Sequence, residues 1–246
     1  MDVTQLSIVA IAFLTAGVIK GAIGVGLPTT AIAILGLALG LRDAVVILIV
    51  PSLIANIWQI ARGGELISLF RRFWLMNATA CLGIWLGTVI FFQIDPAVFS
   101  GLLGIVIGGY AVINLLAYRP TVPNGREFAW SPFVGFAAGL LTGTTGSLLM
   151  PVVVYLQALE LDKDRFVQAA GLSLLIGTVA WAAALFEQGA IDQAAVLLSS
   201  FALIPTVLGM LTGIWLRDRI SQDLFRRFVA LFFLILGGNL IYANWL

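Results

Sequence analysis

Two glycine-rich stretches hold most of the residues that could do chemistry in this chain. The first, G-V-I-K-G-A-I-G-V-G-L-P, covers residues 17–28 and places Lys20 in apolar surroundings. The second, G-L-L-T-G-T-T-G-S-L-L-M-P, covers residues 139–151 and is rich in threonine. A lysine at the centre of a membrane helix costs about 2.5–3.5 kcal/mol on insertion scales, so it is a functional candidate. An ammonium group beside exposed backbone N–H groups favours an anionic ligand. The alternative is that Lys20 lies near the membrane surface and extends its ammonium into water.

Both stretches are dense enough in glycine, threonine and proline to end one helix and start another. Non-helical backbone at membrane depth is tolerated only where it is buried in protein or lines a cavity. The helix that restarts there presents free N–H groups and a positive dipole end, which together with hydroxyl donors suit a small oxyanion. The predicted substrate-binding residues are Lys20, Gly21, Gly24, Gly26, Thr29, Thr30, Ser52, Asn56, Thr142, Gly143, Thr144, Thr145, Gly146 and Ser147. Further polar candidates for the same cavity are Ser173, Thr178, Asn77 and Gln168.

Two structural alternatives apply to these residues. A threonine hydroxyl also bonds to a carbonyl of its own helix, which would remove it from ligand binding. Glycines four residues apart allow two helices to pack closely. We prefer this packing role for Gly83 and Gly87 and for Gly209 and Gly213, and a binding role for the two glycine-rich stretches.

The composition indicates which elements position these residues. The chain has 246 residues, of which 61% are hydrophobic and 10% charged, and its mean hydropathy is +1.09. A soluble domain is about 45–50% apolar and about 25% charged. These values, with a net charge of only +1, exclude a soluble globular protein, a disordered chain and a nucleic-acid-binding protein. The sequence predicts an all-α, multi-pass membrane protein whose partners are the lipid bilayer and a small anionic substrate.

The chain has little material for catalysis. It contains no histidine and one cysteine, Cys81, which lies in an apolar run. Imidazole metal sites and Ser–His triads are therefore excluded, and no aspartate or glutamate pair lies inside an apolar segment. We expect no enzyme activity, no metal and no cofactor.

Ten apolar segments fall into two halves of five. About 20 apolar residues are needed to cross a bilayer, and the first two segments of each half are shorter than that. Gly17, Gly21 and Gly24 recur as Gly139, Gly143 and Gly146, which indicates an internal repeat. We predict a first repeat at 1–118, a polar cytoplasmic linker at 119–130 and a second repeat at 131–246. Whether the short segments span or re-enter stays open. The segments are 5–19, 27–41, 44–61, 73–92, 97–118, 131–141, 147–159, 166–186, 194–216 and 228–246.

The charged residues predict that the two repeats are inverted. If the segments alternate sides, one side collects Arg62, Arg71, Arg72, Arg119, Arg126, Lys163, Arg165, Arg217, Arg219, Arg226 and Arg227. The other side has only Arg42. By the positive-inside rule both termini are then non-cytoplasmic. The basic loop after the third segment corresponds to a loop with only Glu187 and Asp192, as expected if equivalent loops lie on opposite sides.

The motifs K-G-A-I-G-V-G-L-P and T-G-T-T-G-S-L-L-M-P-V-V-V-Y-L-Q-A-L resemble those of the TauE/SafE family of sulfite and organosulfonate exporters. The resemblance implies an inner-membrane permease for a sulfur-containing anion. It differs from the common pattern at Val25 and Leu27, which are interleaved with the glycines, and at Ser147, where glycine is frequent. The matched positions are Lys20, Gly21, Gly24, Gly26, Pro28, Thr142, Gly143, Gly146 and Pro151.

The expected function is export of sulfite or an organosulfonate by alternating access, at a midplane site between the two inverted repeats. The alternatives are an anion channel and a transporter of another small anion such as a carboxylate. The substrate, the coupling ion, the direction in the cell and the oligomeric state stay open.

Overall fold

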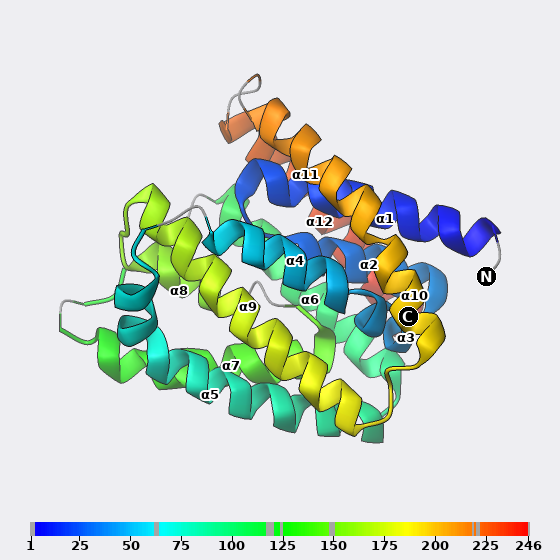
Figure 1. Cartoon of the computed structure of the whole chain (residues 1–246), viewed down its shortest axis with the longest axis horizontal. Helices are drawn as coiled ribbons and strands as arrows, with labels where there is room; N and C mark the ends of the chain where they lie inside the picture. Colours follow the sequence, from blue (N-terminus) through cyan, green and yellow to red (C-terminus); the bar gives the residue numbers. More distant parts are fainter. Residues whose placement is uncertain are drawn as a thin grey trace. The chain divides into compact units, whose positions relative to one another are not determined.

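A computed structural model describes residues 3–61, 64–116, 121–123, 125–147, 151–217, 219 and 222–245 of the chain. Within these residues every regular element is a helix (Figure 1), which confirms the all-α class.

The described residues leave out Arg62 and Arg119 of the charge pattern. They also leave out residues 148–150 of the second glycine-rich stretch. The helices are α1 (Val3–Ile23), α2 (Leu27–Leu39), α3 (Leu41–Ile47), α4 (Ile49–Ile60), α5 (Leu66–Gln93), α6 (Pro96–Leu115), α7 (Glu127–Thr145), α8 (Val152–Ala158), α9 (Lys163–Glu187), α10 (Gln193–Phe201), α11 (Leu203–Arg217) and α12 (Gln222–Trp245).

Six helical stretches of the described chain are long and apolar enough to cross a membrane. They are α1, α5, α6, most of α9, α10 with α11, and most of α12, and the pair α3 and α4, bent by 42°, makes a seventh candidate. The multi-pass membrane prediction is confirmed. The prediction of a short first segment is wrong for α1, which has 21 residues because its helix continues through Gly21 to Ile23. The second segments are short: α2 has 13 residues and α8 has 7.

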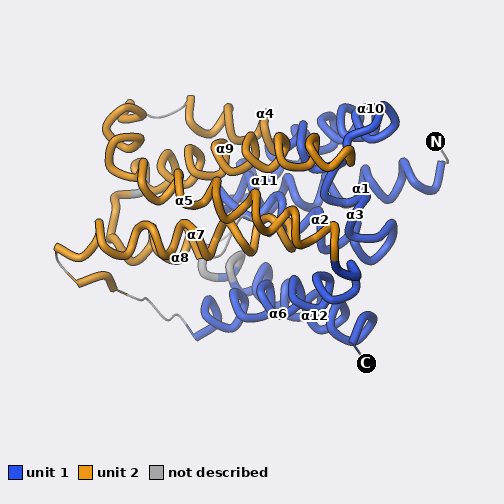
Figure 2. The backbone as a smooth tube through the Cα atoms, turned by 90° about the horizontal axis from the view of Figure 1, so that it is seen from below, with its two compact units in different colours: residues 1–51, 94–118, 191–246 blue, residues 52–93, 119–190 orange. Residues whose placement is uncertain are grey.

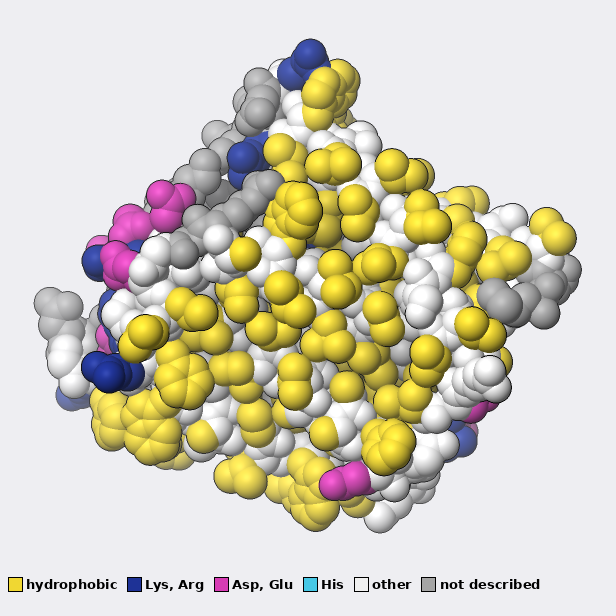
Figure 3. Space-filling view, viewed as in Figure 1, with side chains coloured by type: hydrophobic (Ala, Val, Ile, Leu, Met, Phe, Trp, Pro, Cys, Tyr) yellow, Lys and Arg dark blue, Asp and Glu magenta, His cyan; other side chains and the backbone are white. Residues whose placement is uncertain are grey.

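The outer surface of α11 has the pattern expected of a helix in lipid. Ile204, Leu208, Leu211 and Trp215 recur at helical spacing and are each at least half exposed, while the opposite face buries Pro205, Thr206, Gly209 and Gly213. Hydrophobic side chains dominate the surface drawn in Figure 3, and charged ones are few. Contiguous apolar surface of this extent marks a membrane-facing or partner-facing surface.

The chain forms two compact units, and each takes helices from both halves of the sequence (Figure 2). Unit 1 consists of Met1–Pro51, Ile94–Tyr118 and Ile191–Leu246. Unit 2 consists of Ser52–Gln93 and Arg119–Ala190. In unit 1 the main helix pairs are α1 with α11 and α6 with α12, and in unit 2 α5 packs on α7 and α9.

Glycines make close helix contacts in unit 1. A Cβ atom on Gly17 of α1 would lie 2.5 Å from the Thr206 carbonyl oxygen and 3.1 Å from Gly209 Cα of α11. In the second pair, a Cβ atom on Gly104 of α6 would lie 2.6 Å from the Gly237 carbonyl oxygen of α12. Because these neighbours are backbone atoms, no larger residue fits without moving a helix.

Unit 2 repeats this contact with the equivalent glycines. Gly83 of α5 packs on Gly139 of α7, and a Cβ atom on Gly87 would lie 3.0 Å from Gly143 Cα. Gly139 is the sequence counterpart of Gly17, so each glycine-rich helix packs on the fourth segment of the other half. Close helix packing, which we preferred only for the fourth segments, therefore also holds for Gly17, Gly21, Gly139 and Gly143.

Candidate functional site

The first glycine-rich stretch breaks the helix in unit 1 as predicted. Gly24 and Gly26 have φ angles of +91° and +102°, a conformation open to glycine at little cost. The Gly24 N–H donates to the Lys20 carbonyl oxygen at 2.7 Å, which ends α1, and the Thr30 N–H donates to the Gly26 carbonyl oxygen at 3.0 Å, which starts α2. Pro28 lies in the first turn of α2, where its missing N–H costs nothing.

Polar side chains lie on both sides of this break. Lys20 is in the last turn of α1 and is only 4% exposed. This burial argues against the alternative in which its ammonium extends along the surface into water. Thr29 and Thr30 are in the first turn of α2, and both are buried. Among the described residues the Thr30 hydroxyl has no hydrogen-bond partner. The connection therefore combines a buried ammonium, a hydroxyl donor and a helix N-terminus, which are groups that attract an anion.

The second stretch ends α7 in unit 2, but, unlike Thr30, its threonines have hydrogen-bond partners in their own helix. Gly146 has φ +70° and its N–H donates to the Thr142 carbonyl oxygen at 2.8 Å. The hydroxyls of Thr142, Thr144 and Thr145 donate to the carbonyl oxygens of residues 138, 140 and 141 at 2.8, 2.9 and 2.6 Å. These hydroxyl protons are therefore used by their own helix in this structure. Direct contact of the three threonines with substrate stays a prediction.

The third segments of the two halves meet within unit 2 through equivalent residues. Asn56 Nδ2 of α4 donates to Thr178 Oγ1 of α9 at 3.4 Å, and these two residues are 122 positions apart. Gly17 and Gly139 have the same separation in sequence. The Ser52 hydroxyl, one turn before Asn56, is buried and has no partner within the described part of the chain.

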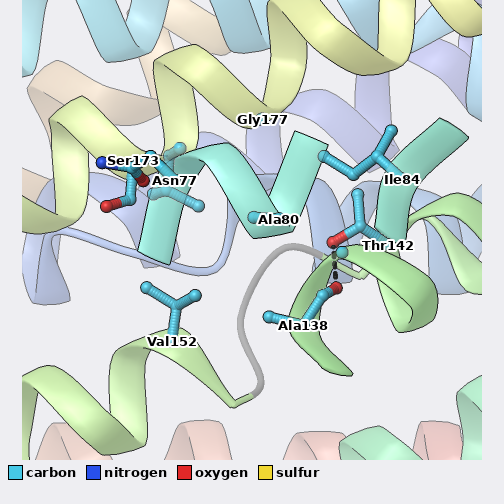
Figure 4. A pocket seen from close by; sticks show the side chains of 10 residues that line it. Asn77, Ala80, Ile84, Ala138, Thr142, Val152, Ser173 and Gly177 are labelled. Atoms are coloured by element: carbon cyan, nitrogen blue, oxygen red, sulfur yellow. Dashed lines mark hydrogen bonds between the residues drawn. The ribbon is translucent and has the colours of Figure 1, made fainter. Parts of the chain in front are cut away.

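A small pocket lies within unit 2 among α5, α7, α8 and α9. Its polar lining is Asn77 of α5, Thr142 of α7 and Ser173 of α9, and apolar residues such as Ile84 and Val152 form the rest. In Figure 4 the Asn77 and Ser173 side chains lie on one side of the pocket and Thr142 on the other. Asn77 and Ser173 were only secondary candidates in the sequence, because a single polar residue in a helix gives a weak signal.

One buried polar residue was missed altogether. Trp181 of α9 is 1% exposed, and its indole N–H has no partner among the described residues. Its burial distinguishes it from the exposed tryptophans near segment ends, which anchor a chain at the membrane surface. No group of three or more His, Cys, Asp or Glu side chains that could hold a metal ion occurs in the described part of the chain.

A family model described as sulfite exporter TauE/SafE matches residues 8–240, which is nearly the whole chain. The chain belongs to this family. Among curated proteins and solved structures, none matches the chain. Membership confirms the resemblance carried by the two glycine motifs, and it implies a membrane anion exporter of the sulfite or sulfonate class.

The backbone at Gly26 gives a first testable prediction. We expect Gly26→Ala to lower the free energy of unfolding by about 1–2 kcal/mol, because an L-residue is disfavoured at φ +102°. Gly36→Ala in the interior of α2 is the control: its Cβ atom would lie 3.6 Å from Leu41 Cδ1, an ordinary contact, and alanine favours the helix. Thermal melting of the purified protein in detergent measures both. Equal melting temperatures for the two variants would contradict the prediction.

Proposed function

We propose that this chain exports sulfite or an organosulfonate by alternating access, at a midplane site between its two inverted repeats. The ten segments form two inverted five-segment repeats, 1–118 and 131–246, joined by the cytoplasmic linker 119–130. The protein lies in the inner membrane with both termini on the non-cytoplasmic side. The substrate-binding residues are those predicted from the sequence: Lys20, Gly21, Gly24, Gly26, Thr29, Thr30, Ser52, Asn56, Thr142, Gly143, Thr144, Thr145, Gly146 and Ser147.

Apart from membership of an anion exporter family, one structural observation supports this proposal. α1 and α7 hold the two motifs, each ends at a left-handed glycine, and each packs through glycines on the fourth segment of the other repeat. Equivalent helices in equivalent surroundings are typical of repeat transporters, whose binding sites lie at interrupted helices near the midplane. Buried polar groups beside the breaks, above all Lys20, would attract the anion.

The membrane potential supplies a driving force for export. Each elementary charge that crosses 100 mV gains about 2.3 kcal/mol, so a dianion leaving a negative interior gains roughly twice that. A carboxylate-bound proton is not required in such a mechanism.

Flux measurement in proteoliposomes that hold the purified protein tests the proposal. We expect protein-dependent, saturable movement of sulfite or a sulfonate whose rate follows the sign and size of an imposed membrane potential. Protein-free liposomes are the control, and acetate is the matched carboxylate. Movement of acetate without any sulfite or sulfonate movement would contradict the proposed substrate class. Very fast flux that does not saturate would contradict alternating access.

A further inference from the structure

The pocket of unit 2 contains hydrogen-bond donors that the protein itself does not use. Within the described residues, Asn77 Nδ2 and Ser173 Oγ have no hydrogen-bond partner, although the two side chains are only 4% and 9% exposed. Buried polar groups in proteins are nearly always paired, and leaving a donor unpaired costs stability. Asn77 and Ser173 come from different helices, α5 and α9, yet line the same pocket. Two unpaired donors in one cavity indicate a ligand that accepts their hydrogen bonds.

The residues around these donors narrow the class of ligand. The described lining has neither an aspartate nor a glutamate, so it carries no negative charge that would favour a cation. The amide N–H₂ group and the hydroxyl together offer up to three donor hydrogens. A ligand that accepts hydrogen bonds at several oxygens and donates few would satisfy them. The remaining wall, with Ala80, Ile84 and Val152, is apolar and suits a small uncharged substituent.

We propose that this pocket binds the S–O head group of the exported anion, with Asn77 and Ser173 as the hydrogen-bond donors. The identity of the anion rests on the proposed function, whereas the position and the donors come from the pocket. Hydrogen bonds from neutral donors to a charged oxygen are stronger than neutral pairs. The described lining contains no lysine or arginine, so inside the pocket the head group is held by hydrogen bonds alone, which allows its release on the far side. Lys20, at the end of α1, acts on the anion at a different point of its path.

Binding to the full-length protein in detergent, measured by titration calorimetry, tests the pocket directly. The probes are sodium sulfite and sodium methanesulfonate, which share the head group and differ in the methyl group that would contact the apolar wall. We expect both to bind the wild-type protein. Preference for methanesulfonate would indicate an organosulfonate as the natural ligand, and preference for sulfite would indicate the free anion.

Substitutions at the two donors give the decisive comparison. We expect Ser173→Ala to raise Kd about 10-fold, the effect of one lost hydrogen bond to a charged group. Asn77→Asp should raise Kd at least about 100-fold, because it replaces the donors with a like charge. Asn77→Leu, of similar volume and apolar, provides a second variant if the aspartate prevents folding. The matched controls are Ser100→Ala on α6 and Asn244→Asp on α12, which lie in unit 1 and should bind as the wild type does.

The outcomes separate the pocket from the transport proposal. Folded donor variants that bind both probes with the wild-type Kd would overturn the pocket, even if the protein exports sulfite. Absence of binding to the wild-type protein would overturn it as well. Normal binding that depends on Asn77 and Ser173, without flux in proteoliposomes, would support the pocket and overturn the proposed export.

Discussion

Lys20→Met should abolish anion flux in proteoliposomes while the protein stays folded. The Lys20 side chain is 4% exposed in the last turn of α1, directly before the left-handed glycines. At 4 Å and an effective dielectric constant of about 20, an ammonium attracts a monoanion by about 4 kcal/mol. Loss of that attraction corresponds to a fall of roughly 10³-fold in the flux at low substrate concentration. Methionine has a similar length and no charge, so its burial in an apolar helix does not cost stability.

The control for this variant is Arg71→Met at the start of α5, where the arginine side chain is exposed. It also replaces a cationic side chain with methionine, but at a position that we assign to topology, and we expect wild-type flux. Gel filtration and thermal melting report whether each variant is folded. If the Lys20→Met variant transports with the wild-type KM, Lys20 does not belong to the substrate site.

The second large effect concerns the glycines between α5 and α7. Gly143→Ala should lower the free energy of unfolding by about 1–3 kcal/mol, the usual range for overpacking, or prevent folding. Its Cβ atom would lie 2.6 Å from the Thr88 nitrogen and 2.8 Å from the Gly87 carbonyl carbon. These are backbone atoms of α5, so relief requires the two helices to separate. Gly17→Ala should have a comparable effect between α1 and α11, because its Cβ atom would lie 2.5 Å from the Thr206 carbonyl oxygen.

The chain offers matched controls for these substitutions. Gly108 on α6 and Gly238 on α12 lie inside helices, and a Cβ atom on either would meet no other atom within 4 Å. Replacing them with alanine should raise stability by about 0.5–1 kcal/mol, because glycine is a poor helix residue. Thermal melting in detergent compares the four variants. Melting of the Gly143→Ala protein at or above the temperature of Gly108→Ala would show that α5 and α7 do not approach so closely.

The sequence could predict the class of the fold and the places where its helices break. Composition alone indicates membrane helices, and the φ angles at Gly24, Gly26 and Gly146 agree with the breaks predicted from the motifs. The length of α1 could not be predicted in this way, because Gly17 and Gly21 resemble helix-breaking residues in sequence. They remain helical since α11 packs against them, and that contact joins residues far apart in the chain.

The candidate site was harder to predict than the breaks. Whether a threonine hydroxyl bonds to its own helix depends on where that helix ends, and α7 continues to Thr145. The helix therefore provides carbonyl acceptors for Thr142, Thr144 and Thr145. The pocket at Asn77 and Ser173 depends on α5, α7, α8 and α9 coming together, and no periodicity in the sequence reports that pairing.

The exchange of partners between the two halves has a consequence for the synthesis of this protein. The glycine face of α1 packs on α11, which the ribosome makes near the end of the chain. At about 5–20 residues per second, α1 waits roughly 10–40 s in the bilayer before its partner emerges. The helix α5 also waits for its partner α7, but for a shorter time, because α7 begins at Glu127. The helices α1 and α6 therefore enter the membrane with their closest contacts unmade, and they reach their final packing on α11 and α12 only when translation is nearly complete.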